Sequence, residues 1–164
     1  MLKRWLTLAA GIILLDQLTK WAVLARFVPG ERLELAPFFN LILTYNSGAA
    51  FSFLAGAGGW QKWFFVALAL GVSAWIVVVL RQHPQQRLQS AALSLIMGGA
   101  LGNVIDRFRF GAVVDFLDFY IGTWHWPAFN VADSAICIGA ALLIWEQLRQ
   151  SGRAPAKEER DVQP

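Results

Sequence analysis

Residues 63–80 read WFFVALALGVSAWIVVVL and residues 88–105 read LQSAALSLIMGGALGNVI, two stretches of 18 positions that contain no charged side chain. A helix rises 1.5 Å per residue, so about 20 apolar residues cross the ~30 Å hydrocarbon core of a bilayer. The two stretches therefore predict two membrane-spanning helices joined by a short connection.

Two further apolar stretches flank this pair, and both contain charged residues. Residues 5–26 include Asp16 and Lys20, and residues 128–148 include Asp133. An ionisable side chain inside a span costs about 2.5–3.5 kcal/mol at the bilayer centre on insertion scales, so it requires a partner or a function. The sequence thus predicts a membrane all-α protein with four spans, at about 5–26, 61–80, 88–106 and 128–148.

The composition excludes a soluble domain. Of the 164 residues, 57% are hydrophobic and 15% are charged, against roughly 45–50% and 25% in soluble domains. Basic residues lie at the ends of the apolar stretches and form no stripe with interleaved aromatic residues, which argues against nucleic-acid binding. We expect one domain over residues 1–150 and a disordered tail over 151–164, where Lys, Glu, Arg and Pro are frequent.

The basic residues also predict the orientation in the membrane. They gather at one end of every span, at Lys3, Arg4, Arg81, Arg87, Arg149, Arg153, Lys157 and Arg160. By the positive-inside rule, both termini are cytoplasmic and the longer connections, about 27–61 and 106–127, lie on the outer side. Arg107 and Arg109 depart from this rule, so we expect them to have a local partner.

The first outer connection contains patterns typical of β-strands. Residues 28–30, VPG, form a turn signal, residues 31–35, ERLEL, alternate in polarity, and residues 38–45, FFNLILTY, favour a strand. A small sheet is therefore predicted over about 28–56, between the first two helices and on the outer leaflet.

Asp16 and Lys20 are four residues apart and share one face of the first helix. Two interpretations remain open. The pair is either a structural ion pair that ties the helix to the sheet, or a group that contacts a substrate directly.

The third span ends in small and polar residues. Gly98, Gly99 and Gly102 are expected to permit close helix packing. Asn103 and Arg107 follow one turn apart at the outer interface, where an amide can bind the backbone and a guanidinium can bind carboxylates or a lipid phosphate.

Four aspartates on the outer side are candidates for acid–base chemistry: Asp106, Asp115, Asp118 and Asp133. If Asn130 is the N-cap of the fourth helix, Asp133 occupies a position that a capping box explains. The helix dipole also favours its carboxylate form there, as a general base requires, whereas apolar neighbours raise the pKa of Asp115. Two such aspartates can share a proton and activate water, as in aspartic proteases. Topology alone leaves every pairing open.

Other chemistries fit less well. The two histidines, His83 and His125, are assigned to opposite sides of the membrane, and no H-E-x-x-H motif indicates a zinc protease. No G-x-S-G element accompanies a serine that could pair with Lys20. The alternative from another class is a small transporter that uses Asp16 and Lys20, although the chain lacks a repeat and its polar residues crowd one interface.

Five motifs follow one another along the chain: DQLTK at 16–20, YNSGAAFS at 45–52, GGALGNVIDR at 98–107, VVDF at 113–116 and FNVADS at 129–134. Together with the four spans, they resemble the lipoprotein signal peptidase family, also called signal peptidase II, of bacterial membrane aspartic peptidases. The resemblance implies an endopeptidase that removes signal peptides from diacylglyceryl-modified prolipoproteins, cutting just before the lipidated cysteine. It also implies the bacterial inner membrane, with the active site toward the periplasm.

The resemblance implies that Asp115 and Asp133 are the catalytic residues. It implies eight further residues that shape or support the site: Asp16, Lys20, Asn46, Gly99, Asn103, Arg107, Asn130 and Ala132. It assigns no role to Asp118. We expect no metal and no cofactor, and a monomer in contact with membrane lipid.

The predicted sheet offers a way to hold the substrate. Asn46 lies at its end, and main-chain pairing there could clamp an extended peptide. Gly48, Ala49 and Ala50 are expected to keep this surface low enough for the peptide.

Overall fold

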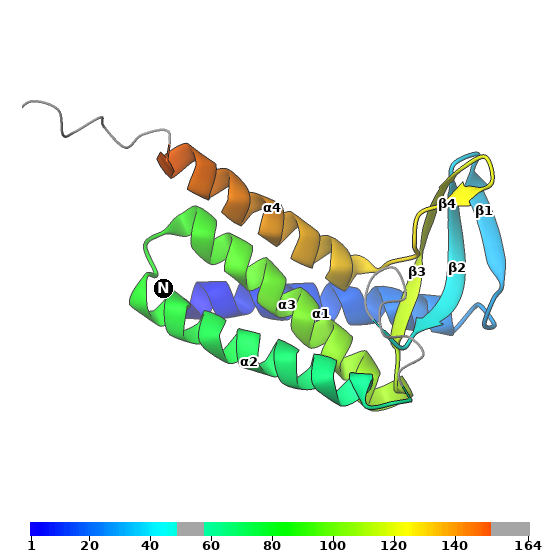
Figure 1. Cartoon of the computed structure of the whole chain (residues 1–164), viewed down its shortest axis with the longest axis horizontal. Helices are drawn as coiled ribbons and strands as arrows, with labels where there is room; N and C mark the ends of the chain where they lie inside the picture. Colours follow the sequence, from blue (N-terminus) through cyan, green and yellow to red (C-terminus); the bar gives the residue numbers. More distant parts are fainter. Residues whose placement is uncertain (49–57, 152–164) are drawn as a thin grey trace, which may run out of the picture.

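The computed structural model describes residues 1–48 and 58–151. Its helices are α1 (Leu2–Leu24), α2 (Gln61–Gln82), α3 (Arg87–Phe110) and α4 (Val131–Ser151), and its strands are β1 (Arg32–Ala36), β2 (Phe39–Asn46), β3 (Val113–Ile121) and β4 (Trp124–His125). All four helices are long and apolar enough to cross a membrane, as predicted. They run lengthwise in one bundle, and the sheet stands at one end of it (Figure 1).

Both described ends of the chain lie at the end of the bundle away from the sheet (Figure 1). The starts of α1 and α3 and the last turns of α2 and α4 therefore share that end. It carries Lys3, Arg4, Arg81, Arg87 and Arg149. The sheet and the opposite helix ends form the other pole.

Most helix boundaries differ from the predicted ones by one to four residues, and two of these differences have a clear local cause. The third helix continues to Phe110, one turn beyond the predicted end, and stops at Gly111, whose φ of 77° is in the left-handed region that glycine adopts most readily. The fourth helix begins at Val131 rather than near 128, because Asn130 caps it.

The third helix is the centre of the bundle. Within its apolar window 50% of the residues are buried inside the protein, against 17–22% for the other three helices. A Cβ at Gly99 would overlap the carbonyl oxygen of Ala132, and one at Gly98 would lie 2.8 Å from that of Ala9. The predicted close packing at these glycines is confirmed.

Two apolar clusters hold the fold, one at each pole. The first joins α1, α2 and α3 through Trp5, Ala9, Ile76, Leu80, Leu93 and Met97. The second joins α1 to the sheet through Val23, Leu43, Val114 and Phe116. Along α1, Asp16 and Lys20 lie between these clusters.

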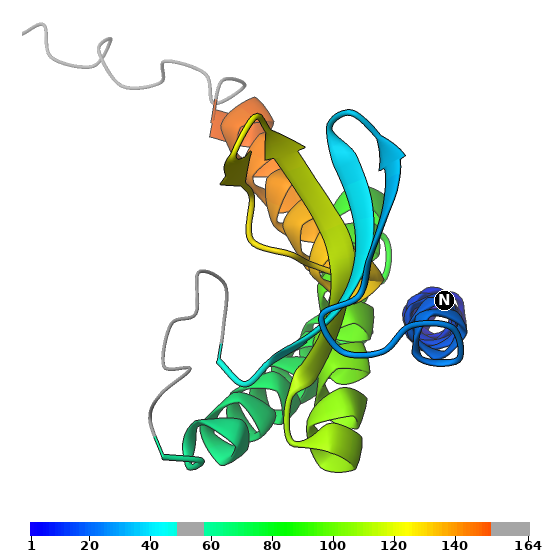
Figure 2. The ribbon, with the colours of Figure 1, turned by 90° about the vertical axis from the view of Figure 1, so that its right-hand side faces the viewer.

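The sheet draws on two connections, the one between α1 and α2 and the one between α3 and α4. Its order is β1-β2-β3-β4, and each neighbouring pair is antiparallel. The prediction of strands in the first connection is confirmed, but its confinement to residues 28–56 is wrong, because β3 and β4 come from the second connection. In Figure 2, β2 and β3 lie side by side across the ends of the helices. The predicted part over 49–56, with Ala49 and Ala50, and the tail over 152–164 lie outside the described residues.

Candidate active site

A buried lysine connects the first and third helices. The Lys20 Nζ lies 2.8 Å from Asp16 Oδ2 and 2.7 Å from Asp106 Oδ2, and it donates to Asn103 Oδ1 at 3.0 Å. Lys20 is 2% exposed and both carboxylates are fully buried, so these charges depend on one another for stability. The interpretation as an ion pair describes this geometry. The ion pair ties α1 mainly to α3 rather than to the sheet. Its link to the sheet is Asp106, which accepts a hydrogen bond from the Val114 N–H.

The second oxygen of Asp16 holds the start of α4. Asp16 Oδ1 accepts a hydrogen bond from the Ala132 N–H at 2.9 Å. An N–H in the first turn of a helix has no partner within that helix, and here a carboxylate of α1 provides one. Ala132 is fully buried against Gly99 and Gly102. Larger residues at these positions would separate α4 from α3.

Asn130 connects the two aspartates of the predicted pair. Its Oδ1 accepts from the Asp133 N–H at 2.9 Å, which is the N-cap hydrogen bond of α4. Its Nδ2 donates to Asp115 Oδ1 at 2.7 Å. Because Asn130 is fully buried, this one side chain fixes the start of α4 and ties it to the strand that carries Asp115.

The carboxylate of Asp133 is oriented by α3. Asn103 Nδ2 donates to Asp133 Oδ1 at 2.8 Å, and Asn103 Oδ1 accepts from Lys20 Nζ. The same carboxylate also accepts a hydrogen bond from the Asn130 backbone N–H, and Asn130 Oδ1 accepts from the Asp133 N–H, so the two residues form the capping box that the sequence suggested. The side chain is half-buried, so it retains access to water.

Asp115 has an altered acidity. Burial, followed by the negative charge of Asp133, raises the pKa of Asp115 to about 7, while hydrogen bonds from Asn130 and Asn46 act in the opposite direction. The direction predicted for Asp115 is confirmed. Asn46 is the last residue of β2 and lies opposite Val113. A carboxyl with this pKa beside a second carboxylate can hold a proton at neutral pH.

Arg107 joins α3 to the segment that follows β2. Its Nη2 donates to the Gly48 carbonyl at 2.9 Å and its Nη1 to the Asn103 carbonyl at 3.3 Å. The guanidinium carbon lies 5.0 Å from the centre of the Phe65 ring of α2. Arg107 thus has local partners, and its hydrogen bonds go to main-chain carbonyls rather than to the carboxylates that were considered.

Asp118 belongs to a separate polar cluster with one residue from each strand. It accepts from Asn40 Nδ2 at 2.9 Å, lies 2.8 Å from His125 Nδ1 and lies 3.7 Å from Arg32 Nε. Burial acts upward on the pKa of Asp118, but the hydrogen bonds from Asn40 and His125 outweigh it and lower this pKa. This environment stabilises an anion, in contrast to that of Asp115.

The sequence offered no reason to select Gln17 as a site residue, and it indicated Asp106 only as a candidate for acid–base chemistry. Gln17 Nε2 donates to Asp106 Oδ1 at 2.9 Å and to the Gly102 carbonyl at 3.2 Å. Asp106 is fully buried and bound by Lys20, which makes it a structural acid. Both residues lie within the quoted motifs. A polar side chain in an apolar helix is costly, and this cost was the sequence signal that could have indicated a buried partner for each.

The described residues offer no metal centre. Over 1–48 and 58–151, no group of three or more His, Cys, Asp or Glu side chains is arranged to hold a metal ion.

Comparisons with known proteins agree with the motifs. A family model described as signal peptidase (SPase) II matches residues 8–149. The lipoprotein signal peptidase of Burkholderia thailandensis is 60% identical over 146 residues, which are 89% of this chain and 88% of that relative. That of Paraburkholderia phymatum is 59% identical with the same coverage.

Two solved structures are also similar, and both are described as bacterial membrane enzymes. One has a TM-score of 0.84 at 32% identity and covers 96% of this chain and 95% of its own. The other has a TM-score of 0.77 at 33% identity, with coverages of 90% and 94%. The similarity therefore extends over nearly the whole chain.

Proposed function

This chain belongs to the signal peptidase II family, and we propose that Asp115 and Asp133 form its catalytic pair. It is an aspartic endopeptidase that removes signal peptides from prolipoproteins, so its reaction needs two carboxyl groups that share a proton. The observation that carries the proposal is Asn130, which donates to Asp115 and accepts from the Asp133 N–H. Family membership also decides against the alternative of a small transporter.

The two carboxyl groups have different roles in this proposal. Asp115 holds the shared proton, because its pKa is raised to about 7 by burial and by the charge of Asp133. Asp133 is the carboxylate that faces water, since it is half-buried. As the water oxygen attacks the peptide carbonyl carbon, Asp133 takes a proton from the water and Asp115 gives its proton to the carbonyl oxygen.

The second step reverses these transfers. Asp133 donates its proton to the amide nitrogen as the carbon–nitrogen bond breaks, and Asp115 takes a proton from a hydroxyl of the tetrahedral intermediate. The products are a carboxylic acid and an amine, and the pair again holds one proton. Asp115 and Asp133 thereby regain their starting states.

The remaining predicted site residues position this pair in our proposal. Asn103 orients Asp133 and is itself held by Lys20. The charge of Lys20 is paired with two other carboxylates, so it need not be neutralised by the catalytic acids. The other supporting residues fix the backbone around the pair: Asp16, Asn46, Gly99, Arg107, Asn130 and Ala132.

We propose that the protein lies in the bacterial inner membrane with cytoplasmic termini and a periplasmic sheet. Four apolar helices make it a multi-pass membrane protein, and the positive-inside rule supports this orientation. The pair would then lie near the outer interface, where the scissile bond of a membrane-anchored signal peptide lies. The diacylglyceryl chains of the cysteine after that bond can stay in the bilayer. The site is complete within one chain, which supports a monomer.

The end of β2 is the proposed place for the substrate backbone. Asn46 pairs with Val113, two residues before Asp115 on β3. The pairing between β1 and β2 extends along β2 as far as Ile42. Among the described residues, β1 therefore does not pair with residues 44–46, and that edge of β2 is available to a peptide. An extended substrate pairing there would be separated by β2 alone from the strand that carries Asp115.

Cleavage of a diacylglyceryl precursor by purified enzyme tests the proposal. We expect Asp115→Asn and Asp133→Asn to lose at least about 10³-fold in kcat/KM, in the range of general acid–base contributions. Asp118→Asn is the matched control, because Asp118 is a buried carboxylate of the same strand outside the pair, and it should retain most activity. Full activity in either of the first two variants would reject the pair, and loss of activity in chelator would indicate a required metal.

A further inference from the structure

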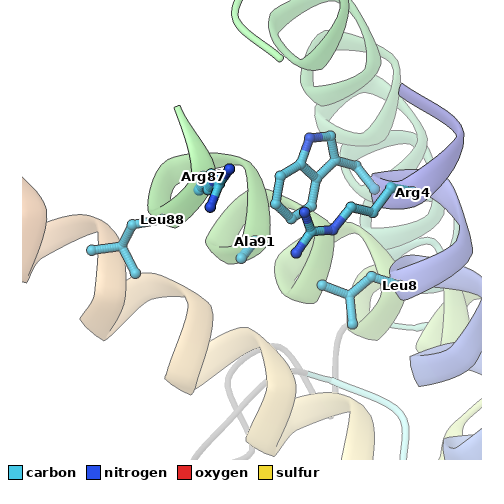
Figure 3. Close-up of a pocket in the computed structure, with 6 residues that line it drawn as sticks. Arg4, Leu8, Arg87, Leu88 and Ala91 are labelled. Carbon is cyan, nitrogen blue, oxygen red and sulfur yellow. The ribbon is translucent and has the colours of Figure 1, made fainter. Parts of the chain in front are cut away.

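A groove opens between the starts of α1 and α3, at the pole opposite the proposed catalytic pair (Figure 3). Its volume is about 500 Å³, and it is lined by Arg4, Trp5, Leu8, Arg87, Leu88 and Ala91. This volume lies within the roughly 300–1,000 Å³ of sites that bind small molecules. The groove is unrelated to the protease reaction, so its lining requires a separate explanation.

The position of Arg4 is fixed by its neighbour. Its guanidinium carbon lies 4.9 Å from the centre of the Trp5 ring, a cation–π contact. Trp5 is 4% exposed, and its Nε1–H donates to the Pro84 carbonyl at 3.3 Å. Arg87, the first residue of α3, approaches the same space from the other helix (Figure 3). Two arginines that are 83 positions apart in the sequence therefore line the same groove.

The positive charge of these arginines is not balanced nearby. Within the part of the chain that the structure describes, no ion pair involves Arg4 or Arg87. The first turns of α1 and α3 contain no acidic residue, and the starts of both helices add partial positive charge. The mouth of the groove thus favours an anion.

The floor of the groove is apolar. Leu8, Leu88 and Ala91 are half-buried and belong to the membrane-spanning helices. A freely soluble anion would leave these side chains without a partner, whereas an acyl chain would cover them. The ligand therefore needs an anionic head and an apolar chain.

We propose that this groove binds one anionic phospholipid, with its phosphate between Arg4 and Arg87 and an acyl chain along Leu8, Leu88 and Ala91. Guanidinium groups bind phosphate through paired charge-assisted hydrogen bonds, and basic pockets between spanning helices are suited to such head groups. In the orientation proposed above, this lipid belongs to the cytoplasmic leaflet. By contacting both helices, it would stabilise the packing of α1 against α3.

Lipid retention by the delipidated full-length protein in neutral detergent tests this proposal. Native mass spectrometry counts bound phosphatidylglycerol, which is anionic, and bound phosphatidylcholine, which is zwitterionic. We expect tighter binding of phosphatidylglycerol, weakened about fivefold by Arg4→Gln or Arg87→Gln and about 30-fold by both. The matched control is Arg81→Gln with Arg149→Gln, two exposed arginines at the same pole outside the groove, which should change binding less than about twofold.

Activity separates this site from the catalytic one. In neutral detergent the variant with both Arg4→Gln and Arg87→Gln should cleave the precursor at the same rate as the unaltered enzyme. Unchanged cleavage would also show that this variant is folded. Equal retention of the two lipids, or equal losses in the two double variants, would overturn the proposal. Displacement by equimolar inorganic phosphate would also overturn it, because an acyl chain would then contribute nothing. Binding that requires removal of residues 152–164, which include Glu158, Glu159 and Asp161, would assign the groove to the tail instead.

Discussion

Lys20→Met keeps a long unbranched side chain and removes the ammonium that lies 2.8 Å from Asp16 and 2.7 Å from Asp106. At an effective dielectric constant of about 20, each pair of unit charges at this distance attracts by about 6 kcal/mol. Losing the buried ammonium also removes its desolvation penalty of several kcal/mol, so the two attractions are not lost in full. We expect the free energy of unfolding to fall by about 3–5 kcal/mol, as when one partner of a buried ion pair is removed.

Unfolding of the purified protein by dodecyl sulfate in mixed micelles measures this loss. Lys3→Met is the control, because Lys3 is exposed on the same helix, and it should change the free energy by less than about 0.5 kcal/mol. Adding Asp106→Asn to Lys20→Met removes one unpaired carboxylate and should recover part of the loss. A Lys20→Met protein within about 1 kcal/mol of the unaltered one would refute the reasoning, because the buried ammonium would then not stabilise the helices.

Three further outcomes follow from the geometry. Gly99→Ala adds a Cβ that overlaps the Ala132 carbonyl oxygen and should lower the free energy of unfolding by about 1–3 kcal/mol in the same assay. Gly71→Ala is the control, because Gly71 has open space around it, and this change should be neutral or stabilising. Equal effects of the two substitutions would contradict the close packing at Gly99. The kcat/KM should fall as pH rises through about 7 because Asp115 loses its proton, and a flat profile between about pH 6 and 9 would contradict that assignment. The pKa of Asp118 is lowered in the folded state, so its stabilising contribution is present above the unfolded pKa of about 3.9 and is lost as pH falls through the folded pKa. Asp118→Asn should therefore weaken the dependence of unfolding on acid. An unchanged dependence would count against the polar cluster around Asp118.

The four helices could be predicted because the hydrocarbon core of a bilayer requires about 20 predominantly apolar residues in every span. Residues 63–80 and 88–105 satisfy this requirement without a single charge, and the other two spans satisfy it around a few polar residues. The strands β1 and β2 were recognisable from alternation and β-branched or aromatic residues. The strand at 113–121 was not recognised, because Asp115 and Asp118 interrupt an otherwise apolar stretch and both are buried by tertiary contacts.

The buried network could be predicted only where its partners are close in sequence. The spacing of Asp16 and Lys20 made an ion pair one of two interpretations, but the contact from Lys20 to Asp106 depends on how closely α1 and α3 pack. The choice among four aspartates depends in the same way on Asn130, which contacts Asp115 across a strand and a connection. Local patterns contain no information on such contacts, so the residues alone left the pair open and the family resemblance supplied it.

The most direct measurement of the central claim is kcat/KM on a diacylglyceryl precursor for Asp115→Asn, Asp133→Asn and the variant with both changes. If the two acids share one proton and act as a unit, each single change should lose at least about 10³-fold. The double change should then lose no more than about threefold beyond the larger single loss, because residues that act together are strongly non-additive. Losses that multiply in the double variant, or a single variant with full activity, would contradict the pair.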